Sequence, residues 1–270
     1  MPPLRLGTKA MTPPSKSLPQ SRHSPAVVDL RQISVILLDI EGTTTPAEFV
    51  YQTLFPYARK HLKSFLERHT TRPEVLSDID LLRREYSEDR KKDPQIPDWR
   101  MDSREADLAS AALYADWLMK QDRKSTALKS LQGKIWEEGY GGGVLRGLVY
   151  DDVPQALNRW KAAGKEICIF SSGSILAQIL LFTTTSHGDL TPFFRAHFDT
   201  TTGSKLAPES YQRIAVALKR STSEVLFISD VAAELDAARL VGIEVVLCMR
   251  SDGPGTSLSD YSIIHSFHEI

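Results

Sequence analysis

Side chains that could bind and cleave a phosphate ester follow four short apolar runs of this sequence. Each set stands at, or shortly after, the end of a run that is typical of a buried strand. In chain order the sets are Asp39 with Glu41, Ser171 with Ser172, Lys205, and Ser229 with Asp230. Phosphoryl transfer needs a nucleophile, a proton-transfer group and positive charge, and these residue types supply them. The sequence therefore predicts a phosphoryl-transfer site if the four runs end side by side.

Each residue has a role that its chemistry allows. Asp39 would attack phosphorus and form an aspartyl-phosphate. Glu41 would protonate the leaving oxygen and then activate water, and the neighbouring negative charge raises its pKa in the direction that this role needs. Ser171 and the amide of Ser172 would hold phosphate oxygens, and Lys205 would link the phosphate to the nucleophile.

The charge balance of such a site calls for a divalent cation. Asp39 and Asp230 contribute about −2 and a phosphate about −2, so an attacking carboxylate would be repelled. Mg²⁺ and Lys205 would change the total from about −4 to about −1. Oxygen ligands suit Mg²⁺, and no His or Cys stands at ligand spacing beside these runs. We therefore expect a magnesium-dependent site with one ion per subunit.

A parallel sheet could place these residues along one edge. Short apolar runs predict strands at 33–38, 166–170, 196–198, 225–228 and 244–247. Helix-like stretches lie between them at 153–163, 175–182, 209–219 and 232–241. This alternation indicates an α/β fold, a doubly wound and mostly parallel sheet whose ligands bind beyond the carboxyl ends of the strands.

The segment 47–140 interrupts the alternation, because it has no good strand and several helix-like stretches, at 58–68, 104–120 and 126–136. It predicts an all-helical cap over the strand ends, inserted into a core made of 31–46 and 141–270. Within it, 87–100 is charged, contains two prolines and is interpreted as an exposed loop. The glycine-rich stretch 139–147 does not match the pattern GxGxxG, because Arg146 stands where the last glycine belongs, and no Lys-Ser or Lys-Thr pair follows it as in a P-loop. We interpret it as a hinge back into the sheet.

Composition excludes other classes of partner. A net charge of −1 over 270 residues gives no general attraction for nucleic acid, and no apolar stretch approaches the roughly 18 residues of a membrane span. Cys168 and Cys248 stand in strand-like runs, which predicts reduced core thiols and a cytoplasmic location. Residues 1–30 predict a disordered, basic, proline-rich tail. Its prolines argue against the amphipathic helix of a mitochondrial presequence.

Taken in order, these motifs resemble the haloacid-dehalogenase superfamily of aspartyl-phosphate phosphatases. From about residue 33 to 267 the chain is similar to the acireductone-forming enolase-phosphatases of methionine salvage. The matching segments are VILLDIEGTTTP at 35–46, LFPYA at 54–58, DRKSTALKSLQGKIWEEGY at 122–140, SSGS and QILLF within 171–182, and HFDTTTGSK at 197–205. Superfamily members commonly have Asp where this chain has Glu41, and the glutamate is similar to this family.

The resemblance implies a ligand set and a substrate. The implied magnesium ligands are Asp39, Glu41 through its backbone carbonyl, and Asp230, and the implied substrate ligands are Ser171, Ser172 and Lys205. The implied reaction enolises 2,3-diketo-5-methylthiopentyl-1-phosphate and then dephosphorylates it to the acireductone 1,2-dihydroxy-3-keto-5-methylthiopentene. The implied protein is a monomer of the cytoplasm, with the nucleus as an additional compartment. The tail and residues 206–208 depart from the family pattern.

Several alternatives stay open at this point. The same residues could serve a phosphatase for another small phosphorylated metabolite, because the catalytic set does not choose a substrate. A non-catalytic adaptor that uses the cap surface is a third alternative, against which the intact acids and lysine argue. The enolisation base is open, with Glu41 a candidate by position. Glu234 could contact the metal shell or pair with Arg239 or Lys219 on the helix surface.

Overall fold

The structure is a computed structural model that describes residues 29–121, 123–251 and 261–270. The predicted disordered tail, 1–30, lies outside the described residues except for its last two positions. None of the described helices is long and apolar enough to cross a bilayer.

A six-stranded parallel sheet forms the centre of the core, in the order β3-β2-β1-β4-β5-β6. The strands are β1 (Val35–Leu38), β2 (Glu166–Phe170), β3 (Phe194–Phe198), β4 (Val225–Ser229), β5 (Glu244–Cys248) and β6 (Ser262–Ile264). Every residue of β1 and β4 is buried, as continuous apolar runs predict for central strands. The predicted α/β fold with a mostly parallel sheet is confirmed.

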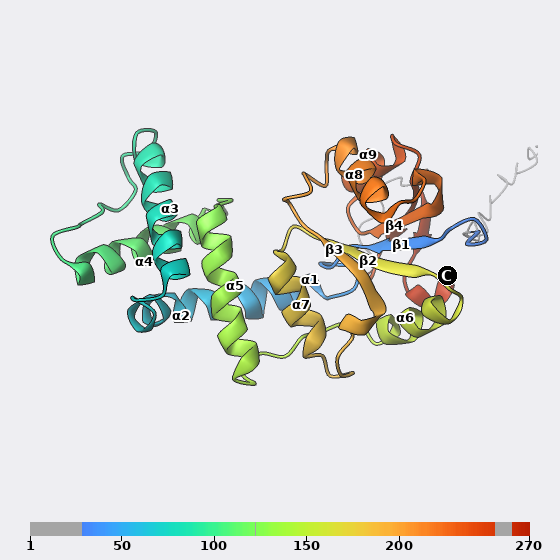
Figure 1. Ribbon diagram of the computed structural model, residues 1–270, viewed down its shortest axis with the longest axis horizontal. Helices are drawn as coiled ribbons and strands as arrows, with labels where there is room; N and C mark the ends of the chain where they lie inside the picture. The colour runs from blue at the N-terminus through green and yellow to red at the C-terminus, as the bar shows by residue number, and fades with distance from the viewer. Residues whose placement is uncertain (1–28, 122, 252–260) are drawn as a thin grey trace, which may run out of the picture.

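Helices cover both faces of this sheet (Figure 1). On one face, Ile36 and Leu38 pack with α6 (Asp152–Ala162) and α7 (Ile175–Thr183). On the other face, Val35 and Leu37 pack with α8 (Pro208–Leu218) and α9 (Ala232–Arg239). Successive side chains of a strand point to opposite faces, so a buried strand must be apolar at every position. The chain ends in a short 3₁₀ helix, Phe267–Glu269, whose Phe267 packs beneath α6.

Between β1 and α6 the chain forms a separate helical layer, seen at the left of Figure 1. Its elements are α1 (Ala47–Phe49), a π-helical turn (Val50–Leu54), α2 (Phe55–Arg68), α3 (Pro73–Arg90), α4 (Arg104–Lys120) and α5 (Thr126–Gly141). Their buried apolar side chains form a hydrophobic cluster of their own, against which partly buried residues of α7 pack. The predicted all-helical insert is therefore present. We propose residues 47 and 140, at the start of α1 and in the last turn of α5, as the boundaries of the cap.

Two features of the fold differ from the sequence predictions. The segment 87–100 is not wholly an exposed loop, because α3 continues to Arg90, Asp89 is buried and Ile96 is 2% exposed. Asp89 accepts hydrogen bonds from Tyr114 and Arg123, which satisfies a charge that the sequence suggested was solvated. The sixth strand, β6, was not predicted, since three residues are too few to carry a pattern.

Gly147 marks the return of the chain from the cap to the core. Its N–H donates to the carbonyl oxygen of Thr184 at 3.2 Å. A Cβ atom at this position would lie 1.8 Å from the carbonyl oxygen of Leu181, so only glycine allows the two backbones to approach this closely. The glycine-rich stretch thus joins the cap to the core.

Candidate active site

Residues 39–45, which we call the acid loop, form a tight turn directly after β1. The amides of Thr44 and Thr45 both donate to the carbonyl oxygen of Ile40 at 2.9 Å, and the amide of Gly42 donates to the carbonyl oxygen of Thr45 at 2.8 Å. Gly42 has φ +73°, a conformation that favours glycine. A Cβ atom there would also lie 2.0 Å from Oδ2 of Asp230, so the glycine lets the ends of β1 and β4 come together.

Asp39 is held in one orientation at the base of this turn. It is 2% exposed, and its Oδ1 lies 2.6 Å from Nζ of Lys205 and accepts a 2.7 Å hydrogen bond from the amide of Ile40. The hydroxyl of Ser229 lies 3.0 Å from Oδ2. The carboxyl that was predicted as the nucleophile and the predicted lysine are therefore in direct contact.

Lys205 is a buried cation, with a side chain 6% exposed. Burial lowers its pKa, but the charges of Asp39 and Glu234 more than offset this effect, so the pKa is raised above its usual value. Its Nζ lies 2.5 Å from Oε2 of Glu234 and about 6 Å from the ring centroids of Phe170 and Phe227. Lys205 therefore remains charged at neutral pH beside Asp39.

Glu234 is a member of the site that the sequence left undecided. It stands in the first turn of α9, and besides Lys205 it contacts the hydroxyl of Ser229 at 3.0 Å. Burial, followed by the charge of Asp39, raises the pKa of its carboxyl. The available signal was its position one helical turn after Asp230, because side chains of a first helical turn point back toward the helix start.

Glu41 and Ser171 meet across the ends of β1 and β2. The Ser171 hydroxyl donates to Oε2 of Glu41 at 3.3 Å and accepts from the amide of Gly173 at 3.0 Å. Burial is the larger cause that raises the pKa of Glu41, and the charge of Asp39 is the next. The direction is the one that the sequence suggested, and it favours the protonated form of the carboxyl more than in an ordinary glutamate.

Asp230 and Ser172 lie toward the solvent side of the same group. Asp230 is an exposed residue by its overall surface, yet the protein atoms that surround its carboxyl, together with the charge of Asp39, raise its pKa to about 7. The pKa depends on the surroundings of the carboxyl group, which lies against Gly42, more than on the exposure of the whole residue. Ser172 is exposed on the turn beside Ser171, and among the described residues no hydrogen bond of its hydroxyl to the other predicted site residues is found.

Gln178 of α7 stabilises the turn that carries Ser171 and Ser172. Its Nε2 donates to the carbonyl oxygens of Gly173 and Phe198, at 3.0 and 2.9 Å. Because its amide nitrogen donates, its Oε1 accepts. Oε1 lies 3.0 Å from Nδ1 of His197, so Nδ1 carries the hydrogen of this bond. Burial lowers the pKa of His197. The role of Gln178 gave no signal in the sequence.

The cap reaches this edge of the core through Lys129 of α5. Its Nζ lies 2.9 Å from the hydroxyl of Thr200 and 3.8 Å from Oδ2 of Asp199, just beyond β3. The lysine is about a third exposed. These two contacts form a polar link between the two layers, and solvent reaches them.

The donor atoms of the site are compatible with a magnesium ion. Four carboxyl groups, those of Asp39, Glu41, Asp230 and Glu234, surround one buried lysine, so the cluster carries a charge of about −3 when all are ionised. In the part of the chain that the structure describes, no three side chains of His, Cys, Asp or Glu are arranged to hold a metal by themselves. Two carboxylates and a backbone carbonyl, completed by water and substrate, are instead the kind of set that Mg²⁺ takes.

Comparisons with known proteins identify relatives of this chain. Residues 33–242 match the haloacid dehalogenase-like hydrolases. The chain is 47% identical to the enolase-phosphatase E1 of Synechococcus elongatus and 43% identical to that of Pseudomonas aeruginosa, with 88% of this chain and 98% of each relative covered. It superposes on the crystal structure of the UTR4 protein from Saccharomyces cerevisiae with a TM-score of 0.70 at 31% identity, over 88% of this chain and 100% of that one.

Proposed function

The chain belongs to the haloacid dehalogenase-like hydrolases and, within them, to the enolase-phosphatases, and from this premise we propose the reaction that its site performs. It is a phosphatase that acts on a small phosphorylated substrate. The proposed substrate is 2,3-diketo-5-methylthiopentyl-1-phosphate, which is enolised and then dephosphorylated to 1,2-dihydroxy-3-keto-5-methylthiopentene in methionine salvage. The buried contact between Asp39 and Lys205, with Glu41 and Ser171 facing each other beside it, is the observation that supports this proposal most strongly.

Asp39, Asp230 and the backbone carbonyl of Glu41 are the groups that would hold one Mg²⁺. When bound, the ion would supply positive charge that polarises a carbonyl or phosphoryl oxygen and reduces the repulsion between carboxylate and phosphate. Burial of the Asp230 carboxyl, followed by the charge of Asp39, raises its pKa to about 7, and a cation bound there would favour the ionised form against both effects.

The phosphatase half uses Asp39 and Glu41 in turn. The Asp39 carboxylate attacks phosphorus, the bond from phosphorus to the ester oxygen breaks, and that oxygen takes a proton from Glu41. Glu41 then accepts a proton from the water that attacks the aspartyl-phosphate, and the bond between phosphorus and Asp39 breaks to release phosphate. Lys205 stays charged beside the nucleophile, while the Ser171 hydroxyl and Ser172 amide would hold phosphate oxygens.

The enolase half requires removal of a proton from the carbon beside a carbonyl. Glu41 is our candidate for the base, because its carboxyl contacts the Ser171 hydroxyl within the influence of the Asp39 charge, and its raised pKa suits proton transfer. The cap would exclude water from the enediol intermediate.

We further propose that the enzyme works as a monomer in the cytoplasm. Both cysteines are free and buried, and burial raises the pKa of the Cys168 and Cys248 thiols to about 12, so they are inert. Nothing in their surroundings requires an oxidising compartment.

The direct test supplies the diketo phosphate with Mg²⁺ and follows enediol absorbance together with released phosphate. The proposal expects an absorbance that rises and phosphate that appears after it, and expects EDTA to stop both. Phosphate release without any enediol would instead indicate a phosphatase for another metabolite. Enolisation that survives in EDTA would separate the metal from that half of the reaction.

A further inference from the structure

Arg250, two residues beyond β5, contacts the acid loop. Its Nε and one terminal nitrogen donate to the same acceptor, the carbonyl oxygen of Thr43, at 2.9 and 2.7 Å. The other terminal nitrogen donates to Oδ2 of Asp152 at 2.6 Å. Both charged side chains are 8% exposed, so the pair is buried.

The surroundings of Arg250 fix it in place. Its guanidinium carbon lies 4.3 Å from the ring centroid of Tyr150 and 4.5 Å from that of Phe267. The Oδ2 of Asp152 also accepts from the hydroxyl of Ser266 at 2.9 Å and from the amide of Phe267 at 2.6 Å. A buried cation that makes three hydrogen bonds and has aromatic rings beside it has little freedom to move.

This cluster joins both connections between the core and the cap. Thr43 precedes the point at which the chain leaves the core for α1, and Tyr150 and Asp152 follow the point at which it returns. The amide of Tyr150 also donates to the carbonyl oxygen of Thr44 at 3.1 Å. Arg250 therefore holds the outgoing and returning segments together where they enter the core.

We propose that Arg250 is a positioning residue for phosphoryl transfer. By fixing the Thr43 carbonyl, it holds the turn that presents Glu41 to Ser171 and places Gly42 against Asp230. The inference rests on the proposed function for its chemistry. Buried Arg–Asp pairs commonly serve the fold alone, so the test must separate position from stability.

Arg250→Lys is the variant that separates an effect on the position of the turn from an effect on stability. Lysine retains the positive charge for Asp152 but cannot place two donors on Thr43 while it does so. Displacement of a catalytic turn by about 1 Å can cost about 100-fold in rate, so we expect kcat to fall by about 10- to 100-fold. We expect KM to change by less than about threefold, because Lys205 and Ser171 lie on other loops.

Arg159→Lys is the matched control. Arg159 of α6 donates to the carbonyl oxygen of Phe267 at 2.5 Å and to that of Ile270, and thus contacts the same C-terminal segment. No hydrogen bond or ion pair between it and the acid loop is found among the described residues. We expect its kcat to stay within about twofold of wild type, even where its melting temperature falls.

Both variants are assayed with the diketo phosphate and with p-nitrophenyl phosphate, after circular dichroism has shown that they are folded. The second substrate needs no enolisation. The ratio of the kcat of Arg250→Lys to that of wild type on p-nitrophenyl phosphate therefore tests this inference even if the diketone is not the substrate. Equal kcat for Arg250→Lys and wild type, or equal loss in Arg159→Lys, would overturn the proposal. If Arg250→Lys does not fold, Asp152→Asn takes its place, and an unchanged kcat there would overturn it in the same way.

Discussion

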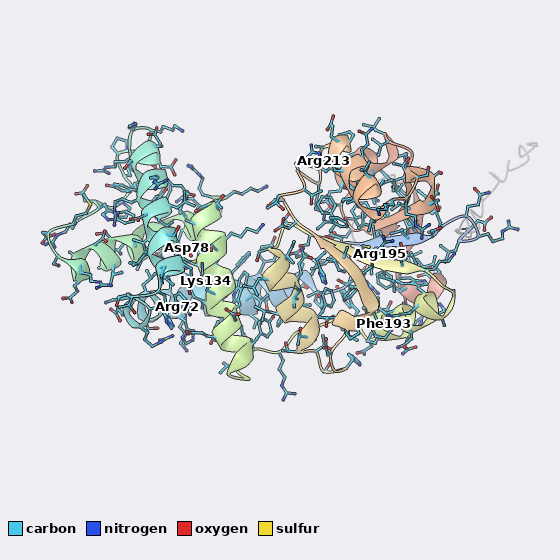
Figure 2. The ribbon with its side chains drawn as sticks, in the orientation of Figure 1. Arg72, Asp78, Lys134, Phe193, Arg195 and Arg213 are labelled. Atoms are coloured by element: carbon cyan, nitrogen blue, oxygen red, sulfur yellow. The ribbon has the colours of Figure 1, made fainter. Side chains whose placement is uncertain are left out.

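The core and the cap each contain a lysine beside an aspartate, buried in the core and partly buried in the cap, and the two pairs differ in what surrounds them. In the cap, Nζ of Lys134 lies 2.5 Å from Oδ2 of Asp78 and 2.7 Å from the hydroxyl of Ser130, so one positive charge meets one negative charge. Figure 2 shows these two side chains pointing toward each other between α3 and α5. In the core, Lys205 faces Asp39 and Glu234, with two more carboxyl groups close by.

The balance of charge distinguishes a structural pair from a chemical one. A balanced pair with a hydroxyl beside it satisfies its own atoms and can hold two helices together. A cluster with an excess of about three negative charges is costly in a folded protein, and such a cost persists where function requires it. This difference predicts that substitutions in the cap pair will reduce stability and that substitutions in the core cluster will reduce catalysis.

The largest effect is expected for Asp39→Asn. Without the carboxylate nucleophile, phosphate release should fall by at least about 1000-fold. The free energy of unfolding should equal or exceed that of wild type, because one of the crowded negative charges is gone. Phosphate assays and urea unfolding measure the two quantities.

Asp78→Asn is the counterpart in the cap. It leaves Lys134 partly buried without its charge partner, which should lower the free energy of unfolding by about 1–3 kcal/mol. Phosphate release at 25 °C should stay within about twofold of wild type. The comparison fails if Asp39→Asn turns over normally, or if folded Asp78→Asn is as inactive as Asp39→Asn.

The two lysines provide the next largest contrast. Lys205→Met removes the cation beside the nucleophile, so kcat/KM should fall by about 100- to 1000-fold. Lys134→Met should instead lower the free energy of unfolding by about 1–3 kcal/mol with kcat close to wild type. Steady-state kinetics below the melting temperature of each variant decide this, and equal kinetic losses in the two variants would show that charge balance does not separate the regions.

A smaller effect should come from Mg²⁺ without substrate. Binding to the core cluster should raise the melting temperature of wild type by roughly 5 °C at saturation. Asp230→Asn removes a proposed ligand and should lose at least half of this shift, whereas Asp78→Asn should keep the full shift relative to its own melting temperature. Thermal unfolding with and without EDTA measures both, and an equal shift in Asp230→Asn would remove Asp230 from the proposed ligand set.

The sequence predicted the position of the site better than its internal contacts. Continuous apolar runs made β1 and β4 recognisable, and polar residues after such runs must lie at the carboxyl edge of a parallel sheet. The partner of Glu234 could not be read in this way, because it depends on how α9 is oriented by its packing on β4 and β5.

Other misses have the same origin in tertiary contacts. Arg250 is one arginine after a strand, and only the folded chain brings it to Thr43. The end of α3 has the sequence of a charged loop. The partners that donate hydrogen bonds to Asp89 there are Tyr114 and Arg123, which lie 25 and 34 positions away in the sequence. Local pattern cannot report pairs of that separation.

The smallest effect concerns His197, which contacts Gln178 beneath the turn that carries Ser171 and Ser172 and does not belong to the charged cluster. Burial lowers the pKa of its ring below the usual value of about 6.5, so below that pH the unfolded chain binds a proton that the folded chain does not. This group therefore stabilises the fold above about pH 6.5 and loses that contribution as the pH falls toward the folded pKa. His197→Phe keeps a flat ring and cannot titrate, so its free energy of unfolding should fall less than that of wild type between about pH 7 and pH 5. Urea unfolding at a series of pH values measures the two slopes. Parallel slopes would mean that His197 takes up its proton as readily in the folded chain as in the unfolded one, and that the Gln178 contact does not depend on a neutral ring.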